Sequence, residues 1–269
     1  MIQPSDGYTR LAGRREFLFE MMLPLGIRRK TQRSRSSGPT APPVTQSYRM
    51  IGSYPHDAGA FTEGLAYYAG CLYEGTGLEG QSTIRRVELS TGVILQERKL
   101  EDRFFGEGIT ILNSLLFQLT WNTGVCFAYD CKTLSPIRQF RYTGEGWGLT
   151  SDGKRLIMSD GSAVLKWMDP ATFKETRRLA VFDGQRPVSN LNELEHVNGD
   201  IYANILDDTR IAQISAVTGQ VKRWFSLANL RPNRGNRAGV LNGIAYNPDR
   251  KTFLVTGKLW PNLFEIVLV

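Results

Sequence analysis

A single carboxylate between two glycines is the strongest candidate for catalysis in this chain. Glu107 lies in the segment FFGEGIT (residues 104–110). Because glycine has no bulky side chain and tolerates many backbone angles, a ligand can approach a carboxyl in this setting closely. A carboxylate placed in this way can act as a general base and then as a general acid. A solvated turn is the alternative interpretation.

Cysteine and histidine are too few and too scattered to indicate metal or thiol chemistry. The chain holds three cysteines (Cys71, Cys126 and Cys131) and two histidines (His56 and His196), without the clustered spacing of zinc ligands. We therefore predict no metal site and no cofactor. Cys126 and Cys131 are close enough in sequence to form a disulfide across a tight strand pair, but small core residues are the favoured interpretation.

The net charge of +7 is concentrated near the N-terminus. Residues 1–50 contain nine of the 33 Lys and Arg residues and only three of the 26 Asp and Glu residues. The rest of the chain is nearly balanced, so it lacks the basic surplus of a nucleic-acid-binding protein. We predict no nucleic-acid partner.

The N-terminal segment is predicted to lie outside the folded domain. The sequence RREFL (residues 14–18) resembles a twin-arginine export signal, and the apolar stretch behind it (residues 17–27) is too short to span a bilayer. A Pro/Ser-rich linker follows at residues 34–45. We predict a leader and linker over 1–45, a folded domain over 46–269, no membrane span, and a periplasmic or secreted protein. A cytoplasmic protein whose start codon is misplaced is the alternative.

The folded part repeats a pattern of strand, polar turn and strand. Four turns share it, at residues 87–92 (VELSTG), 129–134 (YDCKTL), 168–173 (MDPATF) and 214–219 (ISAVTG). From Val87 to Tyr129, Met168, Ile214 and finally Ile266, the steps are 42, 39, 46 and 52 residues. Steps of this length are typical of propeller blades. The fold class is therefore predicted to be all-β, a five-bladed β-propeller.

The two ends of the folded part are predicted to close the ring together. The last unit stops at residues 264–269 (FEIVLV) without an outer strand, whereas residues 48–54 (YRMIGSY) form a strand-like stretch before the first complete unit. Pairing these two segments would satisfy two otherwise open edges. In such a ring, residues far apart in sequence meet at one central mouth.

Motifs along the folded part carry a family resemblance. They are, in order, AFTEGL (60–65), FGEG (105–108), Trp121, EGWGL (145–149), LNELE (191–195), VLNGIA (240–245) and TGKLWP (256–261). From about residue 48 to residue 269, the chain resembles the plant and bacterial class of glutaminyl cyclases. The resemblance implies a five-bladed propeller that converts N-terminal glutamine of peptides or proteins to pyroglutamate, with loss of ammonia and without the catalytic zinc of the animal enzymes. A monomer is expected.

The same resemblance implies the roles of individual residues. Glu107 matches the catalytic proton shuttle, and Asn192 and Lys258 match polar positions that hold the substrate amide, its developing oxyanion and the substrate backbone. Aromatic positions that would surround the glutamine stem are matched by Phe61, Phe105, Trp121 and Trp147. The structural alternatives are core aromatics for Phe61 and Trp147, a turn for Asn192 and a solvated charge for Lys258. Core packing is favoured for Trp167, Trp224 and Trp260.

Two residues depart from the plant pattern. Glu63, predicted to lie beside the substrate, stands where the plant members carry glutamine, and Leu206 replaces an aromatic residue. A charged Glu63 near Glu107 would hinder the second deprotonation. Glu63→Gln is therefore expected to raise activity and shift the pH profile. The smaller Leu206 is expected to weaken binding or broaden substrate choice.

Two other functional classes remain open on residue types alone. One is a metal-dependent propeller hydrolase, similar to a lactonase, with Glu63, Asn192, Asn242 and an aspartate as oxygen ligands for calcium. The other is a propeller that binds a partner without catalysis, because a fold does not fix a function.

Overall fold

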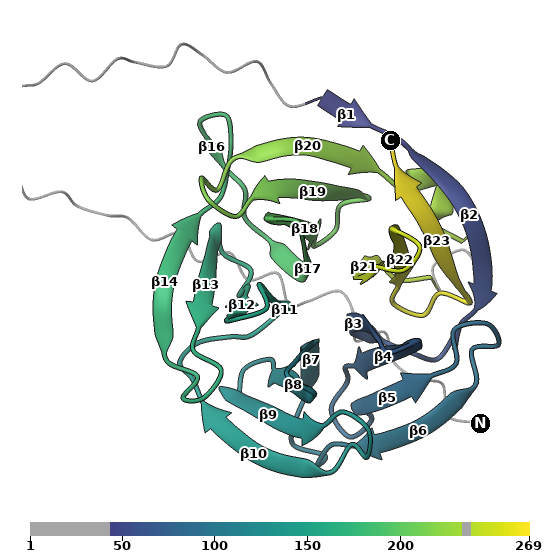
Figure 1. The fold of residues 1–269 in the computed structure, drawn as a ribbon, viewed down its shortest axis with the longest axis vertical. Coiled ribbons are helices and arrows are strands. Elements are labelled where there is room, and N and C mark those ends of the chain that lie inside the picture. The colour runs from purple at the N-terminus through teal and green to yellow at the C-terminus, as the bar shows by residue number, and fades with distance from the viewer. Residues whose placement is uncertain (1–43, 233–237) are drawn as a thin grey trace, which may run out of the picture. The chain divides into compact units, whose positions relative to one another are not determined.

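Short strands build almost all of the folded part of the chain. The computed structural model describes residues 44–232 and 238–269. These residues form five blades of four antiparallel strands around a centre, and one blade carries a short fifth strand at its outer edge (Figure 1). The chain is therefore an all-β, five-bladed propeller, as predicted.

In four blades the chain runs outward through four consecutive strands, from the inner strand to the outer one. Blades one and two comprise β3 (Thr62–Tyr68), β4 (Cys71–Thr76), β5 (Thr83–Val87) and β6 (Ile94–Lys99), then β7 (Gly106–Leu112), β8 (Leu115–Thr120), β9 (Val125–Asp130) and β10 (Pro136–Arg141). Blade three comprises β11 (Leu149–Ser151), β12 (Leu156–Met158), β13 (Val164–Met168) and β14 (Glu175–Ala180). Blade four comprises β17 (Leu191–Val197), β18 (Asp200–Ile205), β19 (Arg210–Ser215) and β20 (Val221–Ser226).

The fifth blade joins the two ends of the folded part. Its inner three strands are β21 (Leu241–Asn247), β22 (Thr252–Gly257) and β23 (Asn262–Leu268), and its outer strand is β2 (Tyr48–Pro55). Antiparallel pairing of β2 with β23 runs from Tyr48 opposite Leu268 to Pro55 opposite Asn262. The predicted pairing of residues 48–54 with the last blade is therefore present. All five repeat positions found in the sequence lie in the third strand of a blade.

Apolar side chains fill the space between neighbouring blades. One cluster joins blades three and four around Trp167 and Trp224, and another joins blades four and five around Trp260. These three tryptophans are buried, which confirms their assignment to the core. Cys126 and Cys131 are also buried, and all three cysteines carry free thiols.

The described structure begins inside the predicted linker. A short strand, β1 (Val44–Gln46), pairs in parallel with the outer edge of β20. The export-like leader lies outside the described residues. A hairpin of β15 (Phe182–Asp183) and β16 (Arg186–Pro187) joins blades three and four, and the short helix η1 (Ala228–Leu230) follows blade four. Within residues 44–232 and 238–269, no helix has the length and apolar character needed to cross a membrane.

Removing residues 1–43 is expected to leave a folded and active protein, because the blades begin after them. We expect the melting temperature to move by less than about 4 °C, the scale of a 1 kcal/mol change in a domain of this size. Differential scanning calorimetry measures it. The control is removal of residues 1–55, which strips β2 and leaves β23 as an open edge. Loss of cooperative unfolding in the shorter truncation would show that the domain extends into the leader.

Candidate active site

A β-bulge interrupts the inner strand at the same place in four of the five blades. The register shifts fall at residues 62–64, 106–109, 191–194 and 241–244. A bulge adds an unpaired residue and turns its side chain away from the regular alternation of the strand. The residues within these four bulges include Glu63, Glu107, Asn192 and Asn242. The repeated bulge thus places four polar side chains at equivalent positions around the centre.

Glycines next to these positions let the inner strands approach each other closely. A Cβ atom on Gly64 would lie 2.5 Å from the amide nitrogen of Ile109, and one on Gly108 would lie 2.5 Å from the carbonyl oxygen of Trp147. The Gly108 amide donates to that same carbonyl at 2.7 Å. Side chains at these glycines would push the blades apart, so the glycine beside Glu107 is needed for packing at the ring centre.

The fourth blade carries a glutamate where its neighbours have glycine. Glu193 is fully buried, and its two carboxylate oxygens accept hydrogen bonds from the amides of Leu65 (3.1 Å) and Ile244 (2.8 Å). These amides belong to blades one and five, so one side chain ties three blades together across the centre. Burial raises the pKa of Glu193 well above its ordinary value, against the opposing effect of the Leu65 amide.

Glu107 is a buried carboxyl with a raised pKa. Its side chain lies on β7, and the residue is 6% exposed. Burial is the main cause of the raised pKa, the nearby Glu63 carboxylate adds to it, and the Lys258 ammonium opposes it. A carboxyl whose pKa is moved towards neutrality can both accept and release a proton under physiological conditions. This property is what the predicted proton shuttle requires.

Glu63 and Lys258 form a buried ion pair beside Glu107. The Lys258 ammonium lies 2.6 Å from Glu63 Oε1, and the amide of Asn242 donates to Glu63 Oε2 at 3.0 Å. The Lys258 side chain is 11% exposed and its Nζ lies 4.5 Å from the centroid of the Phe61 ring. Lys258 is therefore not a solvated surface charge. Burial raises the pKa of Glu63, while Lys258 opposes the change.

The predicted aromatic residues form an arc of half-buried rings. Phe61 and Phe105 meet edge to face with centroids 6.2 Å apart, and Phe105 meets Trp121 at 5.8 Å in the same manner. Phe61, Phe105, Trp121 and Trp147 all keep part of their surface exposed. Partial exposure distinguishes them from the fully buried core aromatics, and it leaves apolar surface for a ligand.

Glu145 is a member of this site that the sequence analysis did not assign. Its Oε2 atom accepts hydrogen bonds from both indole nitrogens, Trp121 Nε1 and Trp147 Nε1, each at 2.9 Å. One exposed carboxylate therefore fixes the orientation of two rings, and it also contributes to the raised pKa of Glu107. The signal in the sequence was the acid two residues before Trp147. Its contact with Trp121, 24 residues away, depends on the fold.

Asn192 lies in the strand β17 rather than in a turn. The residue is 4% exposed, and its Oδ1 atom is buried without a hydrogen-bond partner among the described residues. Its backbone carbonyl accepts from Ser159 Oγ at 2.7 Å, which holds the main chain in place. Leu206 follows β18, whose last residue Ile205 pairs with Leu191, so Leu206 lies at the same end of blade four as Asn192.

The described residues do not assemble a metal-binding set. No group of three or more His, Cys, Asp and Glu side chains in residues 44–232 and 238–269 is arranged to hold a metal ion. The lactonase hypothesis needs Glu63 and Asn242 as oxygen ligands. In the structure, Glu63 binds the Lys258 ammonium, and Asn242 turns its amide nitrogen towards Glu63. The Lys258 ammonium therefore occupies the side of Glu63 that the calcium hypothesis would give to the ion.

Replacing Glu63 with glutamine is expected to shift the acid limb of the kcat/KM profile to lower pH. The substitution removes a neighbouring negative charge that raises the pKa of Glu107, so Glu107 ionises at lower pH. Activity should then rise on the acid side. We expect the gain in activity only on the acid side of the pH profile, because glutamine leaves the Lys258 ammonium without its counter-ion. An acid limb that stays in place would contradict the coupling of the two carboxyls.

Three comparisons with known proteins give matches over most of the chain. The family described as glutamine cyclotransferase matches residues 22–268. A curated glutaminyl-peptide cyclotransferase from Arabidopsis thaliana is 38% identical, over 100% of this chain and 90% of the relative. The crystal structure of Myxococcus xanthus glutaminyl cyclase is 36% identical, covers 84% of this chain and 98% of its own, and superposes with a TM-score of 0.78.

Proposed function

Because the chain belongs to the glutamine cyclotransferase family, we infer that it is a glutaminyl-peptide cyclotransferase. Its substrates are peptides or proteins with N-terminal glutamine, which it converts to pyroglutamate with release of ammonia. The observation that carries this function is the buried, pKa-raised carboxyl of Glu107 next to an arc of partly exposed aromatic rings. One proton shuttle and an apolar surface are what the reaction needs.

The reaction is an intramolecular substitution at the side-chain amide. The α-amine of the N-terminal glutamine attacks the carbonyl carbon of its own side chain, and a five-membered ring forms. Because both groups belong to one residue, holding them together provides much of the acceleration, and no nucleophile from the protein is required. The new carbon–nitrogen bond forms as the amine loses a proton. The old one breaks as the amide nitrogen gains a proton and leaves as ammonia.

Glu107 is proposed to carry both protons. As a carboxylate it takes the proton of the attacking amine, and as a carboxylic acid it gives a proton to the departing nitrogen. The free carboxylate is then restored, so the cycle needs no other acid or base. Burial suits this exchange because it brings the pKa of Glu107 closer to that of an α-amine.

Asn192 and Lys258 are proposed to bind the polar parts of the substrate. The tetrahedral intermediate carries negative charge on the former amide oxygen, and donors fixed in a water-poor site stabilise such charge strongly. Both side chains are largely buried at the mouth of the ring. The aromatic arc is proposed to contact the glutamine stem and to exclude water, and Glu63 is proposed to orient Lys258.

We also propose that catalysis is independent of zinc and that the protein is an exported monomer. The scattered histidines and cysteines support independence from zinc, and the leader-like residues 14–18 support export. Fractionation of cells that express the full chain, combined with N-terminal sequencing of the product, tests export. Light scattering tests the oligomeric state.

The decisive experiment is incubation of the purified protein with a synthetic peptide that begins with glutamine. Mass spectrometry should show loss of one ammonia per peptide. A peptide with an acetylated N-terminus is the matched control, because its blocked amine cannot attack. Hydrolysis of a lactone that disappears with a chelator and returns with a metal ion would favour the hydrolase class. The absence of cyclisation under all conditions would favour a binding propeller.

A further inference from the structure

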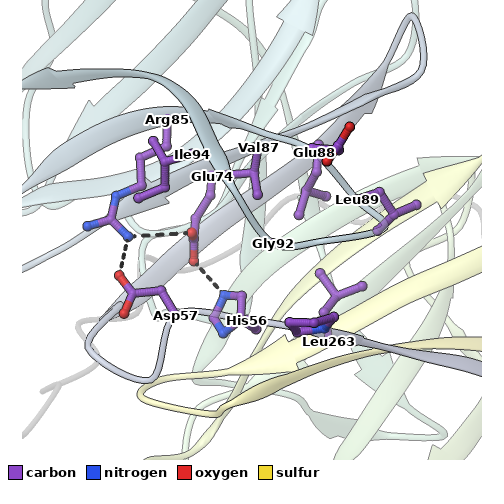
Figure 2. Close-up of a pocket in the computed structure, with 12 residues that line it drawn as sticks. His56, Asp57, Glu74, Arg85, Val87, Glu88, Leu89, Gly92, Ile94 and Leu263 are labelled. Atoms are coloured by element: carbon purple, nitrogen blue, oxygen red, sulfur yellow. Dashed lines mark hydrogen bonds and ion pairs between the residues drawn. The ribbon is translucent and has the colours of Figure 1, made fainter.

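A histidine outside the aromatic arc is buried between two hydrogen-bond acceptors. His56 follows β2, and its side chain is 4% exposed. Its Nδ1 atom lies 2.6 Å from the carbonyl oxygen of Trp260, and its Nε2 atom lies 2.9 Å from Oε1 of Glu74. Figure 2 shows His56 and Glu74 facing each other in a pocket between blades one and five.

The protonation state of the His56 ring depends on whether Glu74 is ionised. A neutral imidazole donates from one nitrogen only, whereas a backbone carbonyl and an ionised carboxylate can only accept. If Glu74 is ionised, both contacts of His56 are hydrogen bonds only when the ring is an imidazolium. Two neighbours other than His56 favour the ionised form of Glu74. These are the Thr62 hydroxyl, which donates to Oε1 at 2.8 Å, and Arg85, whose Nη1 lies 3.9 Å from Oε2.

The charged groups nearest to His56 are acidic, and the one cation behind them is paired with carboxylates. Asp57, next in the chain, and Glu74 on β4 are both acidic, and Arg85 on β5 lies beyond them, paired with Asp57 at 2.8 Å and with Glu97 of β6 at 2.8 Å. Burial alone would favour the neutral ring, but the charge and hydrogen bond of Glu74 outweigh it and raise the pKa of His56. Burial alone would raise the pKa of Glu74, but His56, Thr62 and Arg85 lower it.

The carbonyl held by His56 belongs to the turn that carries Lys258. In this turn Leu259 has a φ of 61°, the left-handed region that is unfavourable for a residue with a branched side chain. Such a conformation persists only where surrounding contacts impose it. Residues 239 and 240 contact one side of the turn, and the segment of His56 supplies the contacts on the other side. The His56 amide donates to the Pro261 carbonyl at 2.9 Å, and the Leu259 amide donates to the Ala60 carbonyl at 2.8 Å.

The other partner of His56 reaches the start of β3. Glu74 accepts from the hydroxyl of Thr62, which is the residue before Glu63. One hydrogen-bonded chain therefore runs from the Lys258 turn through His56 and Glu74 to the strand of Glu63. Its two ends carry the two members of the buried ion pair beside Glu107.

We propose that His56, as an imidazolium, is a positioning residue that holds the Lys258 turn and, through Glu74, the start of β3, so that activity falls when the ring loses its proton. A neutral ring turns a nitrogen lone pair towards either the Trp260 carbonyl or the Glu74 carboxylate. Either contact becomes repulsive, and the turn relaxes. This inference rests on the proposed cyclisation, in which Lys258 binds substrate.

Nitrogen-15 NMR of the imidazole rings tests the protonation state directly. The chain has only two histidines, so a His196→Gln variant assigns every signal. We expect both nitrogens of His56 to stay protonated at the pH of maximal activity and to titrate above the ordinary value of 6.5. The amide signals of Lys258 and Leu259 should titrate with them. Burial lowers the pKa of His196, which serves as the internal comparison. A neutral His56 ring at the pH of maximal activity would overturn the proposal.

Kinetics of two variants tests the link to activity. His56→Gln cannot supply both charged contacts, so kcat/KM should fall on the order of ten- to a hundredfold, the scale of a lost hydrogen bond to a charged group. Glu74→Gln should behave differently. A neutral ring can then donate from Nδ1 to Trp260 and accept at Nε2 from the new amide, so the fall in activity that coincides with His56 titration should disappear.

The outcomes separate this proposal from the function on which it rests. An alkaline limb unchanged in Glu74→Gln would overturn the positioning role, even if His56→Gln is too unstable to measure. The His196→Gln control should keep the wild-type profile. If the wild-type protein does not cyclise peptides at all, the proposed function fails. The NMR titration of the Lys258 and Leu259 amides still decides whether His56 holds the turn.

Discussion

Glu107→Gln is expected to abolish cyclisation and to leave the propeller folded. Glutamine keeps the shape of the side chain but cannot take a proton from the amine, so kcat should fall by about 10²–10⁴-fold or more, the usual contribution of a general acid–base group. Single-turnover measurements with a glutamine peptide give the value. Near-normal turnover by the folded variant would remove Glu107 from the mechanism.

The same variant is expected to be more stable than the wild type at neutral pH. The folded protein holds the Glu107 proton to a higher pH than the unfolded chain, whose value is near 4.5. Folded protein therefore loses stability as the pH rises from the unfolded pKa through the folded pKa. Glutamine removes this loss, so the gain should be present at pH 7 and should shrink as the pH approaches 4.5 or below. Chemical denaturation across this range measures it.

Lys258→Met is expected to give the second largest loss of activity. Methionine has a similar length without the charge, so the substrate loses a buried cationic donor, and kcat/KM should fall by about 10²–10³-fold, as for removal of an oxyanion donor. The substitution also removes the cation that lowers the pKa of Glu107. The acid limb of the profile should therefore move to higher pH, opposite to the shift expected for Glu63→Gln.

The double variant Glu63→Gln with Lys258→Met is the control for this pair. It removes both charges, so the acid limb should return towards the wild-type position while turnover stays low. The difference between the double variant and the sum of the single variants measures the coupling within the ion pair. Single variants that leave the acid limb in place, or move it in the same direction, would mean that the pair does not act on Glu107.

The sequence predicts the blade architecture of this protein better than it predicts the contacts between side chains. Repeated turns at fixed spacing report a local pattern, and this is why the third strand of each blade could be found without a structure. The motif matches also located Glu107 and Lys258. The ion pair between Glu63 and Lys258 spans 195 residues and exists only because the ring closes. From the sequence alone, Glu63 is therefore expected to be an unpaired charge.

The roles of Glu145 and His56 could not be predicted from the sequence for a related reason. Residue type alone says that a carboxylate can accept hydrogen bonds, but it does not say which donors it will meet. Two indoles converge on Glu145 from separate loops of blades two and three, and His56 meets a carbonyl 204 residues further along the chain. Contacts of this range follow from the order in which blades pack around the ring.

Closure of the fifth blade by β2 has a consequence for how the active site is made. The strand before His56 is among the first parts of the propeller to be synthesised, and its partner β23 is the last. Contacts between such distant segments carry the largest loop-closure entropy and form late in folding. We therefore expect Lys258 and Glu63 to come together only in that closing step. A nascent or partly folded chain with four finished blades already contains Glu107, yet it lacks the ion pair and the histidine-held turn, so catalytic competence arrives together with the completed ring.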